Sequence, residues 1–344
     1  MRKLLNTLYV TNPDVFLSKD GDNVVAKIEN REVMRLPIIN LEGIVCFNNL
    51  GASKYLMAMC AERNIGLCFV NSCGRFLARV TGGTNGNVLL RRKQYRVADD
   101  QEEALRISKI MIRGKIYNSR KVVERFKRDH ASSVEEFSRV EAVSNALKIN
   151  MRQVLKTESA NELRGVEGDA AGNYFSLFDD MIVAQKPAFI FVGRNRRPPK
   201  DRTNCLLSFV YTLLCHEVQS ALETVGLDPY VGFLHTDRPG RAGLALDMME
   251  ELRAYLADRF VLSLINRKQV SAEDFIEKGA DNIIMSDSCR KTVLAAWQKR
   301  KKDTMSHPFL AVSVPMGLIP YIQAMLMARF LRGDLDNYPV FLIQ

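Results

Sequence analysis

The feature that most constrains the fold is a change in hydrophobic periodicity near residue 81. Before it, apolar residues come in short runs broken by turn residues, as in β-strands. After it, they recur every three or four positions over long stretches, as in amphipathic helices. Shorter helices are expected near 272–278 and 287–302. Between the two parts, residues 81–87 contain three glycines and no apolar residue, so the backbone can change direction there at little steric cost. We therefore predict an α+β chain: a small β-rich domain over residues 1–80, a linker over 81–87 and an all-α domain over 88–344.

The N-terminal domain is predicted to be sheet with one helix. Apolar runs at 15–17 and 24–28 flank an Asp-Gly-Asp-Asn turn at 20–23, whose Gly and Asn tolerate the positive φ of a tight hairpin. A helix is expected over 53–63, with Ser53 as its N-cap. This part of the sequence has no set of residues typical of catalysis. We expect it to serve packing, dimerisation or partner binding.

Charge is unevenly distributed along the chain. The 49 Lys and Arg exceed the 39 Asp and Glu, for a net charge of +10, which suits an anionic partner such as nucleic acid. Residues 81–130 hold 13 basic and 6 acidic side chains, whereas residues 131–344 hold 26 of each. Much of the excess lies on a helix predicted over 101–128, whose nine cations we interpret as a surface that follows DNA phosphates. The alternative is an ordinary solvated helix face.

Cysteine usage and hydropathy argue against a secreted or membrane protein. The seven cysteines form no CxxC pair and stand mostly in apolar runs, which indicates buried thiols in a reducing compartment. The most apolar predicted helix, about 205–225, contains Tyr211, His216 and Glu217, and we interpret it as a core helix rather than a membrane span. Asn204 is its expected N-cap and Gly226 its expected stop. Residues 1–10 are too short and polar for a signal sequence. We expect a soluble, cytoplasmic protein.

We expect the chemistry in the stretch 232–253. His235 ends an apolar run there, a basic Pro-Gly turn follows, and a helix is predicted next. Asp247, Glu250 and Glu251 then share one face of this helix. Imidazole with carboxylate oxygens suits magnesium or manganese better than zinc. The alternative is that the three acids form the solvated face of an amphipathic helix and that His235 is a loop residue.

Two other segments place charged side chains in unusual settings. Glu167 stands between Gly165 and Gly168, on a helix turn that other backbone can approach closely; alternatively it is a first-turn acid favoured by the helix dipole. The segment 194–202 surrounds two prolines with cations, which makes a rigid basic loop suited to phosphate contacts, or else a solvated connector. Its five cations are Arg194, Arg196, Arg197, Lys200 and Arg202.

Three segments together closely resemble the CRISPR-associated integrase family, which inserts new spacers into CRISPR arrays during adaptation. They are LRGVEGDAA at 163–171, RRPPKD at 196–201 with Asn204 and Ser208, and GFLH with DMMEELR within 232–253. Their order and spacing make the resemblance specific. It covers nearly the whole chain, because a β-rich N-terminal domain, a short linker and a helical catalytic domain are that family's architecture.

The resemblance also implies the functional residues. The family's metal ligands fall on Glu167, His235 and Glu250, and Asp247 matches the family's accessory acid near the metal. We therefore expect these four side chains to be catalytic and the first three to bind Mg²⁺ or Mn²⁺. The residues expected to contact DNA, from the family's cation positions and from the basic loop, are Arg238, Arg253, Arg194, Arg196, Arg197 and Arg202.

The implied activity is that of a metal-dependent DNA integrase and endonuclease. The 3′-OH of a short prespacer duplex attacks the phosphodiester at the leader–repeat junction, and related chemistry nicks or cleaves DNA. The implied partners are these two DNAs, a second copy of the chain, and a small CRISPR-associated protein with which the homodimer forms a heterohexamer. The competing interpretations are a non-catalytic basic scaffold for DNA or RNA, and a repair nuclease that shares the site but does not depend on the repeat.

Overall fold

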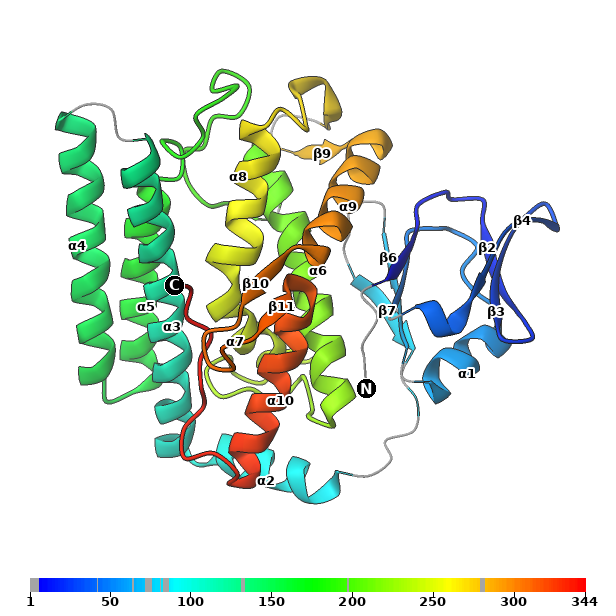
Figure 1. The fold of residues 1–344 in the computed structure, drawn as a ribbon, viewed down its shortest axis with the longest axis horizontal. Coiled ribbons are helices and arrows are strands. Elements are labelled where there is room, and N and C mark those ends of the chain that lie inside the picture. Colours follow the sequence, from blue (N-terminus) through cyan, green and yellow to red (C-terminus); the bar gives the residue numbers. More distant parts are fainter. Residues whose placement is uncertain are drawn as a thin grey trace. The chain divides into compact units, whose positions relative to one another are not determined.

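The chain forms two compact units in a computed structural model (Figure 1). One unit comprises Met1–Gly86, Met285–Met305 and Pro315–Leu318, and the other comprises Asn87–Ile284, Ser306–Val314 and Ile319–Gln344. The linker predicted at 81–87 stays a prediction, because most of it lies outside the described residues. These described residues are 6–41, 43–63, 65–71, 76–80, 82, 87–130, 134–196, 198–278 and 282–344.

Two sheets build the N-terminal unit. The first is an antiparallel meander in which Asp20 pairs with Asn23, so the predicted hairpin is confirmed. Its strands are β2 (Phe16–Asp20), β3 (Asn23–Ile28) and β4 (Arg31–Pro37). The second sheet has the order β1-β5-β6-β7 and is parallel except for the β6–β7 pair. Its strands are β1 (Thr7–Val10), β5 (Gly43–Cys46), β6 (Gly66–Val70) and β7 (Phe76–Val80).

Helix α1 (Lys54–Glu62) packs with these sheets around one apolar core. The predicted N-cap is confirmed, since the Ser53 hydroxyl accepts a hydrogen bond from the Leu56 N–H at 3.3 Å. Strands β3 and β5 each bury three consecutive residues, so both faces of these strands are covered. The fully buried core residues include Leu17, Val24, Ile38, Ile44, Leu56 and Leu67.

A distant segment completes this unit. Helix α9 (Asp287–Lys302) clusters with the N-terminal strands, and the Gln298 side-chain amide donates to the Thr7 carbonyl at 3.0 Å. The Arg290 guanidinium lies 5.7 Å from the centre of the Phe47 ring.

Helices dominate the second unit, as predicted. The main helices are α2 (Val88–Asp99), α3 (Gln101–His130), α4 (Val134–Lys156), α5 (Ala160–Ser176), α6 (Arg202–Val225), α7 (Gly243–Leu252), α8 (Arg259–Asn266) and α10 (Ile319–Arg332). A π-helical turn, η2 (Arg253–Asp258), joins α7 to α8. Helices α3, α4 and α5 pack together, and α6 packs against α7, α8 and α10 (Figure 1).

The C-terminal part is mostly helical rather than all-α. It contains two short pairs of strands, β8 (Phe275–Glu277) with β9 (Ile283–Met285) and β10 (Thr304–Ser306) with β11 (Ser313–Pro315). A helix predicted over 272–278 is therefore wrong. A capping box between Ser271 and Asp274 supports only a short 3₁₀ turn there, and the chain then pairs as β8.

Helix α6 is the core helix of this unit. By length and composition it could cross a membrane, but 61% of its most apolar window is buried inside the protein, as predicted for a core helix. Gly226 ends it in the left-handed conformation, with φ of 86°. The expected N-cap at Asn204 is wrong, because the helix begins a turn earlier and Asp201 accepts the Asn204 N–H.

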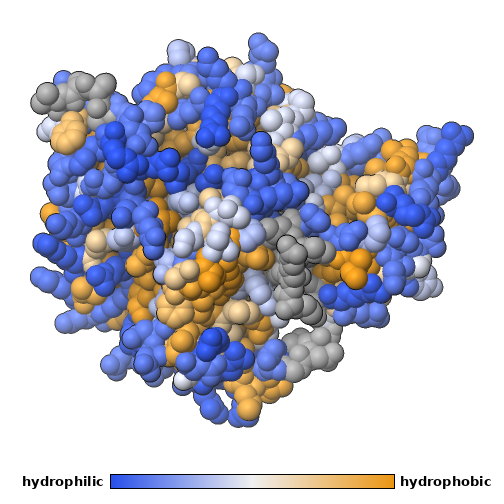
Figure 2. All heavy atoms as spheres, in the orientation of Figure 1, coloured by the Kyte–Doolittle hydropathy of each residue, from blue (hydrophilic) through white to orange (hydrophobic). Residues whose placement is uncertain are grey.

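Hydrophobic side chains also reach the surface of the second unit. Figure 2 shows them gathered near α10. The exposed large hydrophobic residues of this unit include Leu310, Val312 and Met325, at 40–51%.

Candidate active site

The loop that carries His235 is organised by a buried carboxylate on α7. Asp247 Oδ2 accepts the backbone N–H groups of Phe233 at 2.6 Å and Leu234 at 3.0 Å. Its Oδ1 accepts the His235 N–H at 3.1 Å and lies 2.5 Å from the His235 ring Nδ1. Because an ionised carboxylate only accepts, Nδ1 carries the proton and Nε2 keeps its lone pair. Asp247 thus fixes the orientation and tautomer of the imidazole.

Two glycines allow this loop to lie against α7. A Cβ at Gly232 would stand 2.6 Å from Asp247 Oδ2 and 2.7 Å from the Gly243 carbonyl carbon. A Cβ at Gly243 would stand 2.7 Å from the Tyr230 carbonyl oxygen. Side chains at either position would force the loop and the helix apart, so the GFLH run needs glycine at its start.

Lys115 joins the two glutamates that the resemblance selects. Its ammonium on α3 forms ion pairs with Glu167 of α5 and, at 2.8 Å, with Glu250 Oε2 of α7. The Lys115 side chain is 14% exposed, that of Glu250 is 5% exposed and that of Glu167 is 29% exposed. Side chains from three helices thus meet around one positive charge.

Glu250 is the most strongly perturbed acid of this group. Burial alone raises the pKa of its carboxyl group, but the charges of Arg253 and Lys115 outweigh burial and hold the pKa at about 2. His235 is held against Asp247, one turn before Glu250 on the same helix. Arg253 pairs with Glu250 Oε1 at 2.9 Å. Glu250 is therefore ionised at neutral pH.

The chemistry of these side chains fits a divalent cation. Two carboxylates already share one positive charge, and Glu250 Oε2 is buried without a directed hydrogen bond despite its ion pair with Lys115. A histidine with a fixed tautomer lies nearby. Carboxylate oxygens and one imidazole suit magnesium or manganese. Within the described ranges no three His, Cys, Asp or Glu side chains already converge in metal-binding geometry. Lys115 forms ion pairs with both glutamates instead.

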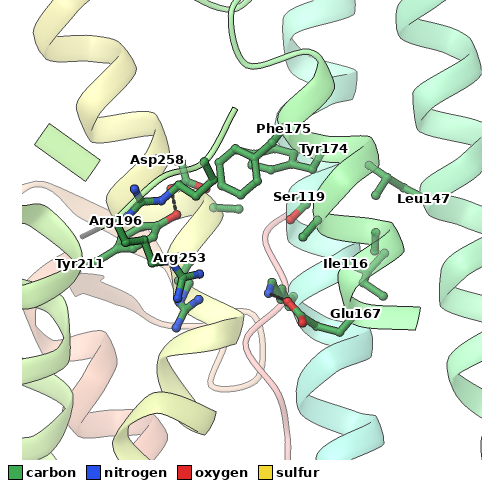
Figure 3. A pocket seen from close by; sticks show the side chains of 15 residues that line it. Ile116, Ser119, Leu147, Glu167, Tyr174, Phe175, Arg196, Tyr211, Arg253 and Asp258 are labelled. Atoms are coloured by element: carbon green, nitrogen blue, oxygen red, sulfur yellow. Dashed lines mark hydrogen bonds and ion pairs between the residues drawn. The ribbon is translucent and has the colours of Figure 1, made fainter. Parts of the chain in front are cut away.

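A small pocket opens beside Glu167 (Figure 3). Arg194 and Arg253 each place the guanidinium carbon 5.3 Å from the centre of the Tyr211 ring, within the range of cation–π attraction. The Tyr211 hydroxyl donates to Asp258 at 2.6 Å. Burial raises the pKa of Asp258 to about 6, although this hydrogen bond opposes the shift. Lys115, Arg196 and Ser119 also line the pocket.

The residues expected to contact DNA lie in different settings. Arg196 and Arg238 are exposed. Arg194 is held inside by Asn204 at 2.6 Å and by Ser208 at 3.1 Å. Arg202 donates to the Ala188 carbonyl at 3.0 Å.

Arg197 lies outside the described residues. The basic face expected on α3 is partly neutralised, since six of its nine cations pair with carboxylates.

The solvated-face alternative for α7 is wrong. Asp247, Glu250 and Glu251 are all buried, with exposures of 1%, 4% and 0%. Glu251 points away from the site and accepts hydrogen bonds from the Tyr338 hydroxyl and, at 3.2 Å, from the Gln323 side-chain amide. Burial raises its pKa to about 7 against the opposing effect of these donors. The three acids therefore have separate partners, which helical spacing could not distinguish.

The alternatives offered for Glu167 also need correction. Glu167 lies in the middle of α5, so it is not a first-turn acid. A Cβ at Gly165 or Gly168 would meet nothing within 4 Å, so the close backbone approach expected there is wrong within this chain. The two glycines instead leave the helix surface beside Glu167 open.

Sequence reasoning missed three features of the site. Lys115 was counted only as one cation of a basic helix face. Arg164, one turn before Glu167, donates to the Leu234 carbonyl at 2.7 Å and so ties α5 to the histidine loop. The C-terminal tail anchors α3 and α7 to each other, because the Asn118 amide donates to the carbonyls of Glu251 at 2.7 Å and Phe341 at 2.8 Å. The spacing of Lys115 and Asn118 on one buried turn is the only local signal for this arrangement.

Comparisons with known proteins identify the family. Residues 8–299 match the family CRISPR associated protein Cas1. A CRISPR-associated endonuclease Cas1 of Chlorobaculum tepidum is 46% identical over 341 residues, covering 99% of both chains. Another, of Rhodospirillum rubrum, is 48% identical over 342 residues, covering 98% of both chains.

The fold agrees with solved structures as well. A casposase bound to its integration product has a TM-score of 0.83 at 22% identity, over 98% of this chain and 94% of that one. A chain of a Cas6-RT-Cas1–Cas2 complex has a TM-score of 0.80 at 21% identity, over 98% of this chain and 36% of that one. The family match and the full-length identities together show that this chain belongs to the Cas1 family, the CRISPR-associated endonucleases and integrases of spacer acquisition.

Proposed function

We propose that Glu167, His235 and Glu250 bind one divalent cation, Mg²⁺ or Mn²⁺, in this Cas1-family enzyme. The observation that carries the proposal is that carboxylates from two helices share one positive charge close to a histidine whose Nδ1 is fixed by Asp247. Asp247 itself accepts three backbone N–H groups and the ring Nδ1. It is thus a positioning residue rather than a fourth ligand.

The reaction is a transesterification of DNA. The 3′-OH of a short duplex attacks the leader–repeat phosphodiester, one P–O bond forms as another breaks, and the target strand leaves with a free 3′-OH. Glu167, His235 and Glu250 would hold the divalent ion, which when bound would polarise the phosphodiester and stabilise the charge on its oxygens. No protein nucleophile is required. Attack by water in place of the 3′-OH gives nicking or cleavage.

The cations around the site are assigned to hold DNA by its phosphates. Arg196 and Arg253 line the pocket beside Glu167, and Arg238 projects from the exposed turn after His235. Arg194 supports this pocket from inside, and we keep Arg197 and Arg202 as expected contacts of the same loop. Phosphate contacts position DNA without reading its sequence.

The assembly is proposed on the same basis. We assign a homodimer that joins a small CRISPR-associated partner in a heterohexamer, and we place the protein in the cytoplasm. The Cas6-RT-Cas1–Cas2 complex and the casposase bound to its integration product are proteins of this fold that carry a partner or joined DNA. The first supports a small partner for this chain, and the second supports a DNA substrate.

Strand transfer tests the proposal. A labelled short duplex is incubated with a supercoiled plasmid that bears a leader and repeat, the small partner and Mn²⁺. We expect joined product with the wild type, none in EDTA and none with His235→Ala, while DNA binding persists. His130→Ala, at the exposed end of α3, is the matched control and should join DNA normally. DNA that is bound but never joined or cut in any metal would support the scaffold interpretation instead.

A further inference from the structure

Lys115 is the one cation that contacts both glutamates of the proposed metal site within the described residues. We propose that Lys115 and the divalent ion compete for these carboxylates, so that the ion must displace the ammonium. The displaced ammonium then faces the pocket beside Glu167, where it can contact a DNA phosphate. This inference rests on the proposed metal site and assigns Lys115 a role in it.

The two oxygens of Glu250 have different partners. Oε1 pairs with Arg253 at 2.9 Å, whereas Oε2 lies 2.8 Å from the Lys115 ammonium. Oε2 is buried, and the Lys115 ammonium is the cation that approaches it. Oε2, which lacks a directed hydrogen bond, is therefore the oxygen that a metal ion can ligate while the Arg253 pair on Oε1 stays intact.

Lys115 and the ion cannot both occupy that position. Direct ligands lie about 2.0–2.1 Å from Mg²⁺, so an ion on Oε2 would lie next to an ammonium 2.8 Å from the same oxygen. Two positive charges at such a distance, in a site that is largely closed to water, repel strongly. Arg253 needs no such movement, because it contacts the other oxygen.

The backbone around Lys115 is fixed, but its side chain can reorient into the adjacent pocket. Ile116 is 1% exposed and Asn118 is fully buried, with hydrogen bonds to the carbonyls of Glu251 and Phe341. Lys115 also lines the pocket that contains Arg196 and Arg253 (Figure 3). Its four-carbon stem can turn the ammonium from the carboxylates into this pocket. Three cations would then face one space suited to a phosphate.

Mn²⁺ binding to Lys115→Met tests the competition without any DNA. Methionine keeps the length of the stem and removes the charge. Mn²⁺ affinity is measured by electron paramagnetic resonance, and the melting temperature is measured in EDTA and in saturating Mn²⁺. Lys121→Met is the matched control, since this lysine lies on the same helix with its ammonium over the Tyr117 ring.

We expect Lys115→Met to bind Mn²⁺ about tenfold more tightly or better, which corresponds to about 1.4 kcal/mol. In EDTA its melting temperature should be lower than that of the wild type, because Glu250 then pairs only with Arg253. The addition of Mn²⁺ should raise its melting temperature by more than it raises that of the wild type. Lys121→Met should match the wild type in both measurements. Lys115→Gln keeps a hydrogen-bond donor but removes the charge, and it should also bind Mn²⁺ more tightly than the wild type. It replaces Lys115→Met in this test if the methionine variant does not fold.

Unchanged Mn²⁺ binding in both Lys115 variants would show that Lys115 does not affect metal binding. Weaker binding in both would show that Lys115 helps to position the ligands. Either result would overturn the inference. Glu250→Gln separates this failure from failure of the site itself. If the wild type binds Mn²⁺ and the Glu250→Gln variant does not, the proposed metal site stands even if the Lys115 variants show no change. No binding by the wild type or by either Lys115 variant would remove both proposals.

Discussion

Asp247 holds His235 at two points, through its backbone N–H at 3.1 Å and through its ring Nδ1 at 2.5 Å. Asp247→Asn replaces one accepting oxygen by an amide that donates. At least one N–H or ring contact of the loop is then lost inside the protein. We expect the free energy of unfolding, measured in urea, to fall by about 3 kcal/mol.

The same substitution should lower the strand-transfer rate about 10- to 100-fold, as when an outer partner of a metal-binding histidine is removed. Asp237→Asn, on the exposed part of the same loop, is the control and should change neither quantity. An Asp247→Asn protein with wild-type rate and stability would show that His235 needs no such support.

The two glutamates should differ in stability although both are needed for activity. Glu250→Gln removes the carboxylate that pairs with buried Arg253 and leaves Lys115 with Glu167 alone, and we expect it to cost about 3 kcal/mol in EDTA. The Glu167 side chain is 29% exposed. Glu167→Gln should therefore lower the free energy of unfolding by about 1 kcal/mol or less. Urea unfolding of both variants measures the difference. Equal losses would contradict the burial difference between them.

Asp258 should make stability depend on pH. Burial raises its pKa to about 6, whereas an unfolded Asp titrates near pH 3.9. Between these values the folded state keeps a proton that the unfolded state has lost, so the free energy of unfolding falls as pH rises through this window. The predicted fall is about 3 kcal/mol from pH 4 to pH 7.

Asp258→Asn should abolish this contribution, so its stability relative to the wild type should rise by that amount over the same range. Urea unfolding at several pH values measures both proteins. Parallel curves for the two proteins would rule out Asp258 as the titrating group.

Gly114 and Val340 should be energetically coupled. A Cβ at Gly114 would stand 2.3 Å from Val340 Cγ2, so Gly114→Ala pushes the C-terminal tail away from α3. We expect a cost of about 1–3 kcal/mol from overpacking. Val340→Ala removes the clashing methyl group, and the double variant should recover part of the loss. A double-mutant cycle without coupling would contradict the tail contact.

Local patterns predicted the parts of the fold that local interactions determine. The hairpin at Asp20 and Asn23, the Ser53 cap and the Gly226 stop each depend on residues close in sequence, and all are confirmed. The helix expected at 272–278 fails because strand pairing with a later segment overrides its helical spacing. The short strand pairs of the mostly helical C-terminal part were not predicted either, because they too join segments that are separated in the sequence.

The site is built from contacts between residues far apart in the sequence, which residue spacing along one helix cannot predict. Glu167, His235 and Glu250 came from the resemblance, and their role as ligands stays a prediction. Lys115 could not be singled out among nine similar cations, because one partner, Glu167, lies 52 residues away in sequence. Glu251 resembled its neighbours on the helix, yet its partner Tyr338 lies 87 residues later, in a tail without regular secondary structure.

The position of a bound ion tests the central claim most directly. Crystals of the protein soaked in Mn²⁺ and measured at the manganese absorption edge locate the metal by its anomalous scattering. We expect one peak at coordination distance from Glu167, His235 Nε2 and Glu250 Oε2, with the Lys115 ammonium withdrawn from both carboxylates. A peak elsewhere, or Lys115 still between the two glutamates beside an ordered ion, would contradict it.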